Sequence, residues 1–318
     1  MVKKSEDPKR IRARFVTLLY FLCACCAIGR RFCFVTTAVA TDVQRSVDAL
    51  RLLNETPLER NGKKPLVPSS RDGIDSLPYG MLEHILGFLE AQEAVRTCML
   101  AKRWHHLWKS ASVMRVISVS DCWIELTALK KFRQFVDCLL DSRGYTPLEA
   151  CELSFNGFYI HDQDMVDFKL CLNRWIRHVV LCQVQMLKLH NLWYLDFEPD
   201  DLPLVSRHLT RLELGGVDLN SSFYDFSSCP SLQHLEIANC YLCHAKKISS
   251  ESLKCLSITN CIFSKEFCTL IDVALLVSLR LDGHLYMAPV LQGMSALQEA
   301  YVVTEPPNLY KIKYGCPH

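Results

Sequence analysis

The chain has 318 residues, which is enough to bury a large core and to form more than one domain. Half of its residues are apolar and 22% are charged, a balance that excludes a wholly disordered chain. The formal net charge of +2 gives no general electrostatic case for nucleic-acid binding. The 17 cysteines are odd in number and scattered, so they indicate reduced, mostly buried thiols in a cytoplasmic or nuclear protein.

The N-terminus carries a basic start followed by an apolar run, Phe15–Gly29, of the length of a signal-peptide core. Arg30-Arg31 then interrupts the run, which is short for a transmembrane helix, and Ala38-Val39-Ala40 offers a cleavage pattern. The run is a working signal or anchor, a tolerated apolar leader, or the result of a start codon assigned too far upstream. Residues 54–75 contain three Pro and two Gly without apolar periodicity, which is typical of a linker. We therefore expect residues 1–70 to be a poorly ordered leader and linker.

Residues 71–115 have a dense helical pattern. Pro78 suits the first turn of a helix, and Leu82, Ile85, Leu86 and Leu89 then follow at i, i+3, i+4 and i+7. A second apolar stripe contains Leu100, Trp104, Leu107 and Trp108. Such a small unit buries little surface alone, so the pattern predicts that its apolar stripe completes a core on a partner.

A longer set of residues in this segment forms one motif: Asp72, Ile74, Leu77-Pro78, Leu82 to Leu89, Glu93-Ala94-Val95-Arg96-Thr97, Leu100 to Trp104 and Leu107-Trp108. With these residues the segment resembles an F-box, in the form that opens plant F-box/leucine-rich-repeat proteins. The sequence departs from the family pattern at Ala101, where Ser is usual, and at Cys98-Met99, which replace a Ser-Val type pair.

The resemblance implies a partner as well as a fold. In the F-box family the apolar stripe docks on the Skp-type adaptor of a Skp–cullin–F-box ubiquitin ligase. The adaptor-binding residues that it implies in this chain are Leu77, Pro78, Ile85, Leu86, Leu89, Val95, Leu100, Trp104 and Trp108.

After the helical segment the pattern changes to strands and repeats. Residues 112–121 alternate like a strand, and Phe168, Leu172, Trp175, Ile176 and Val179 define one helical face. An L-x-x-L-x-L pattern then recurs at spacings of 21 to 25 residues, within the leucine-rich-repeat range. Its second apolar positions are Leu187, Leu212, Leu235, Leu256, Leu279 and Ala300, and a degenerate copy begins at Leu148.

The predicted fold class is therefore an α+β solenoid, in which a small helical F-box precedes leucine-rich repeats over residues 116–318. We expect repeat strands near 148–154, 184–190, 209–215, 232–238, 253–259, 276–282 and 297–303.

One motif suggests a cofactor instead. Cys240, Cys243 and His244 have the spacing of covalent haem attachment, and such a Cys pair can also begin a zinc site. The repeat register explains Cys240 differently, because it and Cys261 occupy the inward position after the strand, where Asn or Cys is favoured. Leu242 is then the next core position. We expect neither a metal nor a cofactor.

Strand alternation places the residues between the repeat leucines on the open face of the sheet. Their mixed charges suit a protein or peptide target better than a phosphate backbone. The candidate target-binding residues are Lys188, His190, Arg211, Glu213, His234, Glu236, Arg280, Asp282 and Tyr301, with Ser257, Thr259 and Glu299 on the same face.

The sequence contains no Gly-rich phosphate loop, HExxH or GxSxG motif, so we expect no enzymatic activity and no catalytic residues. The hypothesis is a substrate-recognition subunit of a Skp–cullin–F-box ligase, located in the cytoplasm or nucleus. Alternatives are a membrane-anchored or secreted leucine-rich-repeat protein that uses Phe15–Gly29, and a pseudo-receptor that binds the adaptor but delivers no target. Relatives of the type that it resembles often continue into a C-terminal FBD domain; we expect that part to be missing here, as in a truncated or misannotated product.

Overall fold

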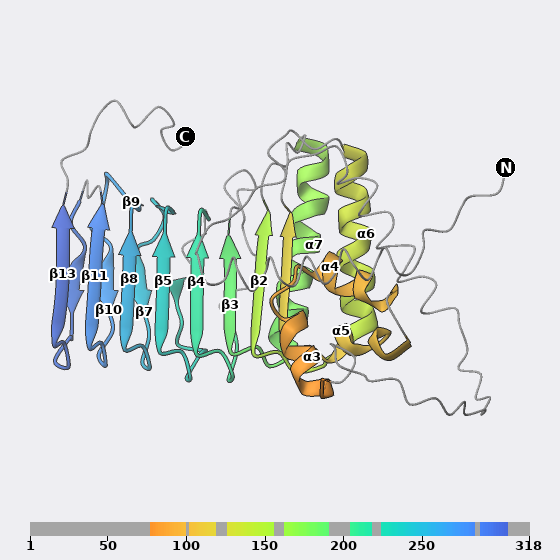
Figure 1. Cartoon of the computed structure of the whole chain (residues 1–318). Helices are drawn as coiled ribbons and strands as arrows, with labels where there is room; N and C mark the ends of the chain where they lie inside the picture. Colours follow the sequence, from red (N-terminus) through yellow and green to blue (C-terminus); the bar gives the residue numbers. More distant parts are fainter. Residues whose placement is uncertain are drawn as a thin grey trace, which may run out of the picture.

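The computed structural model describes residues 77–99, 102–118, 126–155, 162–190, 204–217, 224–283 and 287–304. These residues form a small helical unit followed by an elongated solenoid of parallel strands (Figure 1). The apolar leader, the linker and Leu100 lie outside the described residues. No helix in the described ranges is long and apolar enough to cross a membrane.

The helical unit comprises residues 77–110. Its first helix begins after Pro78, whose φ of −58° is preset for helix entry and whose carbonyl accepts the N–H groups of Met81 and Leu82. That helix ends at Gly87, where an added Cβ would lie 3.1 Å from the Cβ of Val113. The small residue therefore lets the helix approach the first strand of the solenoid. The elements of the unit are α3 (Tyr79–Leu86), α4 (Ala91–Arg96), the 3₁₀ turns Thr97–Met99 and Lys102–Trp104, and α5 (Leu107–Ser110).

The main sheet of the solenoid has eight strands, and every neighbouring pair is parallel. Parallel neighbours need a crossover on one side of the sheet, which gives the solenoid its second layer. In order across the sheet the strands are β1 (Val113–Ser118), β2 (Ala150–Phe155), β3 (Met186–His190), β4 (Arg211–Gly215), β5 (His234–Ala238), β8 (Cys255–Thr259), β11 (Ser278–Gly283) and β13 (Glu299–Thr304).

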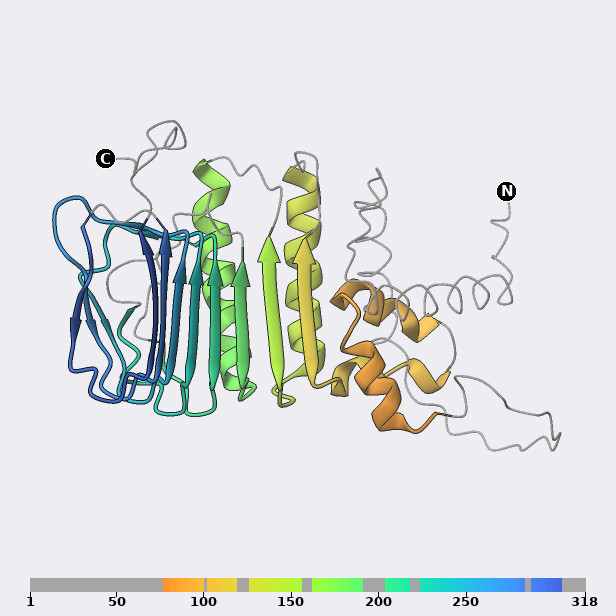
Figure 2. The same ribbon diagram turned by 60° about the vertical axis from the view of Figure 1, so that its left-hand side comes forward.

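The second layer changes along the solenoid. Near β1–β3 it consists of two long helices, α6 (Leu126–Arg143) and α7 (Asp162–Leu181), which lie against one face of the sheet (Figure 2). Toward the C-terminal end, short strands replace them in a three-stranded and a two-stranded sheet. These strands are β7 (Lys247–Ser249), β10 (Leu270–Asp272) and β12 (Val290–Gln292), and β6 (Tyr241–Leu242) with β9 (Ile262–Phe263).

The core lies between the two layers and continues into the helical unit. Each repeat places one leucine beside the leucine of the next strand, and this row is 2% exposed or less from β3 to β11. The row consists of Leu187, Leu212, Leu235, Leu256 and Leu279. Because each repeat buries its apolar side against its neighbours, the solenoid holds together as one stack.

An aromatic cluster fills the core under the helices. Phe132, Phe155, Phe168 and Trp175 meet mostly edge to face at centroid distances of 5.7 to 6.5 Å. The buried indole Nε1–H of Trp175 donates to Asp137 at 2.7 Å, so its polar atom has a partner. The helical face predicted around Trp175 is thus the buried face of α7.

Candidate functional site

The helical unit exposes four large apolar side chains. They are Tyr79, Met81, Phe88 and Met99, with exposed fractions of 59%, 54%, 52% and 68%. Tyr79 and Met81 belong to α3, Phe88 follows its C-terminus, and Met99 ends a 3₁₀ turn. Monomeric proteins rarely expose so much apolar surface in so short a segment unless it meets a partner.

The predicted adaptor-binding residues divide into two groups. Five of them are 4% exposed or less and pack in the core of the chain, so their side chains support the surface from beneath. Pro78 is exposed, Leu77 and Ile85 are partly buried, and Leu100 lies outside the described residues. The five buried residues are Leu86, Leu89, Val95, Trp104 and Trp108.

Arg103 contacts the residues at the start of α3, where the exposed apolar surface begins. The guanidinium of Arg103 lies over the ring of Tyr79, 4.6 Å from its centroid, and donates a hydrogen bond to the carbonyl of Leu77. A cation over an exposed aromatic face contributes about 0.5–1 kcal/mol. Tyr79 and the segment before α3 are thereby held against the turn that carries Arg103.

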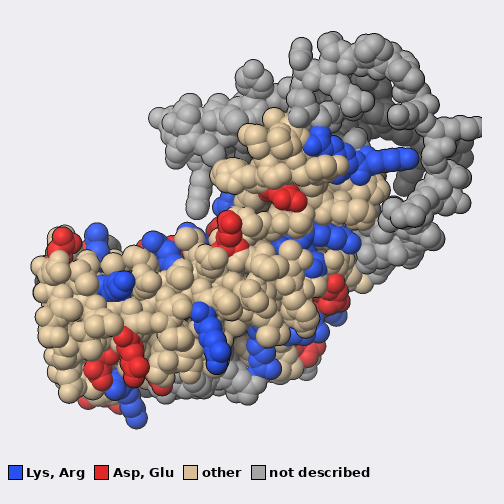
Figure 3. Space-filling model, turned by 90° about the horizontal axis from the view of Figure 1, so that it is seen from below, with Lys and Arg blue, Asp and Glu red and all other residues tan. Residues whose placement is uncertain are grey.

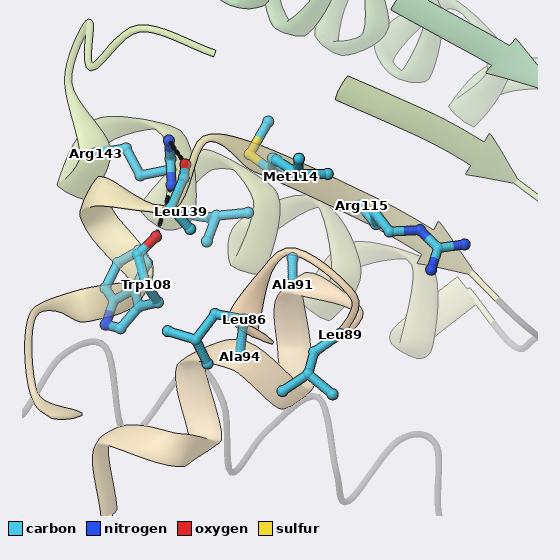
Figure 4. Close-up of a pocket in the computed structure, with 11 residues that line it drawn as sticks. Leu86, Leu89, Ala91, Ala94, Trp108, Met114, Arg115, Leu139 and Arg143 are labelled. Carbon is cyan, nitrogen blue, oxygen red and sulfur yellow. Dashed lines mark hydrogen bonds between the residues drawn. The ribbon is translucent and has the colours of Figure 1, made fainter. Parts of the chain in front are cut away.

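The helical unit is fixed to the solenoid by polar contacts as well as by apolar packing. Arg143, at the end of α6, donates to the carbonyl of Trp108 at 2.6 Å and to that of Ala111 at 2.8 Å. Arg115 on β1 donates to the carbonyl of Phe88 at 3.2 Å and pairs with Glu152 at 2.9 Å. Figure 4 shows Arg143 and Arg115 on opposite sides of a small cavity between the two parts. These contacts join the end of the helical unit to the first strand and first long helix of the solenoid.

The same joint contains carboxylates with raised pKa values. Burial, with Glu93 nearby, raises the pKa of Glu90 from its usual 4.5 to about 7, although Arg115 and Arg96 act in the opposite direction. Burial also raises the pKa of Glu93. Glu90 precedes the first residue of α4, at the turn that leads from Phe88 to the second helix. The charge of the joint therefore changes near neutral pH.

The open face of the main sheet gathers the predicted target-binding residues. Burial alternates along each strand, so the leucines point inward and the polar residues between them stay on the open side. Neighbouring strands align these positions in rows. The central row runs Arg115, Glu152, Lys188, Glu213, Glu236, Ser257, Arg280 and Tyr301, and His190, Arg211, His234 and Asp282 lie in the flanking rows.

Several of these charges neutralise one another. Glu213 lies 2.6 Å from Lys188 and 2.8 Å from Arg211. Burial alone would raise the pKa of Glu213, but the hydrogen bonds from the two cations hold it below its usual value. These three side chains pair with one another on β3 and β4. Figure 3 views the chain from below, and on that side Lys, Arg, Asp and Glu are scattered among other residues of the described surface.

The cysteine motif belongs to the repeat. Cys240 is 2% exposed, and its Sγ accepts the N–H of Val217 at 3.4 Å, while the N–H of Cys240 reaches Sγ of Cys261 at 3.4 Å. The preceding residue, Asn239, has a φ of 54°, which turns the chain so that Cys240 points inward. Leu242 is buried as predicted. Within the described ranges no three His, Cys, Asp or Glu side chains group as metal ligands.

Comparison with known proteins identifies both parts. The F-box domain family model matches residues 74–115, which include the whole helical unit. The described parallel repeats follow immediately. The chain thus has an F-box domain followed by a solenoid of parallel strands, and it is similar to plant F-box/LRR-repeat proteins.

Three similar proteins from Arabidopsis thaliana are all named as F-box proteins, and two of the three names also include LRR repeats. F-box/LRR-repeat protein 13 is 24% identical over 241 residues, 75% of this chain and 50% of the relative. A putative FBD-associated F-box protein is 28% identical over 257 residues, 78% of this chain and 45% of the relative. A putative F-box/FBD/LRR-repeat protein is 29% identical over 168 residues, 52% of this chain and 36% of the relative. In these comparisons the matched region spans about a third to a half of each relative.

Sequence reasoning found the F-box but missed its exposed residues. Met81 and Phe88 are apolar positions that lie off the Leu82–Leu86 stripe, and that phase difference was the available signal, whereas Tyr79 is in phase with the stripe and its exposure gave no such signal. The five buried residues were selected because they match the motif, yet a motif residue can serve either the core or a contact.

Proposed function

We propose that this F-box protein is a substrate-recognition subunit of a Skp–cullin–F-box ubiquitin ligase. The F-box binds a Skp-type adaptor, and the open face of the repeats holds the target protein. The observation that carries the proposal is the exposure of Tyr79, Met81, Phe88 and Met99 within a segment that matches the F-box family. Large apolar side chains of this kind dominate the binding energy of protein interfaces when a partner buries them.

The role is non-enzymatic in this proposal. The protein contributes proximity and orientation, because it holds a target lysine near the ubiquitin-loaded enzyme of the assembled ligase. The joint made by Arg143 and Arg115 supports this role, since such a connection limits where the target lies relative to the adaptor. A role with the adaptor and the ligase core supports a location in the cytoplasm or nucleus. The Phe15–Gly29 run, on which the membrane alternative depends, lies outside the described residues.

The proposed adaptor contacts are revised from the sequence prediction. The direct contacts are Pro78, Ile85, Tyr79, Met81, Phe88 and Met99, and the buried Leu86, Leu89, Val95, Trp104 and Trp108 hold these residues in place.

The test is co-purification of the full chain with a Skp-type adaptor. We expect a stoichiometric complex with the wild type and a loss of binding of about tenfold or more in a Tyr79→Ala, Phe88→Ala variant, because truncation of an aromatic anchor costs about 2 kcal/mol or more. The matched control is Leu170→Ala, Leu181→Ala, which removes two exposed apolar side chains from α7. Failure of a folded wild-type chain to bind the adaptor, or equal loss in both variants, would contradict the proposal.

A further inference from the structure

The two ends of the open sheet face differ in charge. On β1–β4 the open positions carry three cations, Arg115, Lys188 and Arg211, and two carboxylates, Glu152 and Glu213. Each of those two carboxylates lies within 2.9 Å of a cation, so this end is internally paired.

The other end, over β5, β8, β11 and β13, is acidic. Its open positions carry the carboxylates of Glu236, Asp282 and Glu299, and Arg280 is the single Lys or Arg among them. The nearest cation contact of Glu236 is Arg211 at 3.8 Å, and that guanidinium already binds Glu213 at 2.8 Å. The side chain of Glu236 is 46% exposed. Its charge is therefore available to a partner.

Arg280, the single Lys or Arg at these open positions, contacts side chains on its own and the neighbouring strand. The guanidinium of Arg280 lies over the ring of Tyr301, 5.0 Å from the centroid, and 3.4 Å from Asp282. It is held on the β11–β13 side, away from Glu236, which lies two strands away across β8. Arg280 thus does not neutralise Glu236.

Between these charges, β8 presents only short polar side chains. Cys255, Ser257 and Thr259 are partly buried and occupy the three open positions of the strand. Their register partners on β5 and β11 include Glu236 beside Ser257 and Asp282 beside Thr259. Hydroxyl groups lie between carboxylates on both sides, a surface that offers acceptors to a cationic, hydrogen-bonding segment.

We propose that the open face over β5, β8, β11 and β13 binds an extended basic segment of the target protein. The inference rests on the proposed function, since it names the chemistry of the target that the receptor takes. Glu236 and Glu299 lie three strands apart in the sheet, and Glu299 aligns with His234, two residues before Glu236, so the two positions are about 16 Å apart at ordinary spacings. Side chains four residues apart in an extended peptide start about 13 Å apart and point to the same side, and the long side chains of Lys and Arg can span the remaining difference. A segment with Lys or Arg at such a spacing matches both carboxylates as it crosses the strands.

The experiment measures peptide binding by the full chain alone. The probes are two fluorescein-labelled ten-residue peptides of Ser, Thr and Gly, one with two Arg four positions apart and one with Glu at the same positions. We expect fluorescence anisotropy at low ionic strength to show binding of the Arg peptide and binding of the Glu peptide at least tenfold weaker, since like charges oppose it. Added salt weakens the Arg complex.

A charge-matched pair of variants locates the site. Glu236→Gln, Glu299→Gln is expected to weaken Arg-peptide binding about five- to tenfold, as exposed ion pairs contribute modestly. Glu251→Gln, Glu266→Gln removes two exposed carboxylates from loops outside the open face and is expected to leave binding unchanged. Equal affinity for the two peptides, no measurable binding of the Arg peptide, or equal effects of the two variants would overturn the inference.

Adaptor binding separates this inference from the proposed function. Both carboxylate variants are expected to co-purify with a Skp-type adaptor like the wild type. A chain that binds the Arg peptide but no adaptor would contradict the ligase role, whereas the inference that the acidic face binds a basic segment would still hold. A chain that binds the adaptor while Glu236→Gln, Glu299→Gln leaves peptide binding unchanged would contradict the inference alone.

Discussion

Arg143 on the first solenoid helix donates a 2.6 Å hydrogen bond to the carbonyl of Trp108 in the last helix of the F-box. Arg143 is 7% exposed, and burial lowers its pKa. Its other terminal nitrogen donates to the carbonyl of Ala111, so two carbonyls at the end of α5 depend on one side chain. A contact between residues 35 positions apart thus joins the F-box to the repeats.

Replacement of Arg143 by Met is expected to lower the free energy of unfolding by about 2–4 kcal/mol, because two buried carbonyls lose charged donors. It is also expected to uncouple the two parts, so that the F-box unfolds at lower urea concentration than the solenoid. Urea unfolding followed by Trp fluorescence and by circular dichroism measures both effects.

The control for that experiment is Arg207→Met, at an exposed position in the solenoid, which is expected to change stability by about 0.5 kcal/mol or less. Coincident transitions by both probes in Arg143→Met, with stability equal to that of the control, would show that the joint does not depend on Arg143.

Glu90 predicts a dependence of stability on pH. Its pKa is raised to about 7 in the folded chain, mainly by burial, whereas the unfolded chain has the usual 4.5. The folded state therefore retains a proton that the unfolded state loses, and the contribution of Glu90 to stability falls as pH rises from about 4.5 through 7. Glu90→Gln keeps the neutral form at every pH. We expect the variant to be the more stable protein at pH 8 and to match the wild type near pH 4.5.

Thermal unfolding of the two proteins across this pH range gives the comparison, and the difference between them removes contributions from other titrating groups such as His106. Glu251→Gln, which changes an exposed carboxylate, is expected to follow the wild-type curve. A constant difference between Glu90→Gln and the wild type from pH 4.5 to 8 would contradict the raised pKa.

The repeats and the F-box were predictable because both have apolar residues at fixed spacings, and the fold confirms the solenoid class. The spacing could not show which apolar residues meet a partner. Trp104 and Trp108 match the motif, yet they lie in the core of the chain, whereas Phe88 lies off the stripe and is exposed. Periodicity indicates that a side chain is buried, but it does not indicate whether the core of the chain or a partner buries it.

Other features depend on contacts that sequence spacing does not contain. The strands β7, β10 and β12 have three residues each, too few for a periodic pattern. The open-face charges were predicted as one set, but pairing divides them. Lys188 and Glu213 form an ion pair at 2.6 Å, whereas the ion pair of Glu236 with Arg211 is longer, at 3.8 Å. Only the register between strands reveals this division.

The last prediction concerns the Cys240, Cys243 and His244 motif. Cys240 is buried and accepts the N–H of Val217, whereas Cys243 is partly buried and His244 is exposed. Cys240→Ala leaves a small cavity and a buried N–H without its acceptor, so we expect a loss of about 1–2 kcal/mol in the free energy of unfolding. Cys243→Ala and His244→Ala are expected to change it by about 0.5 kcal/mol or less. Urea unfolding of the three variants distinguishes the two interpretations, because residues that ligate one metal or haem would lose stability together. Comparable losses in all three would establish a shared site and contradict the assignment of Cys240 to the repeat architecture.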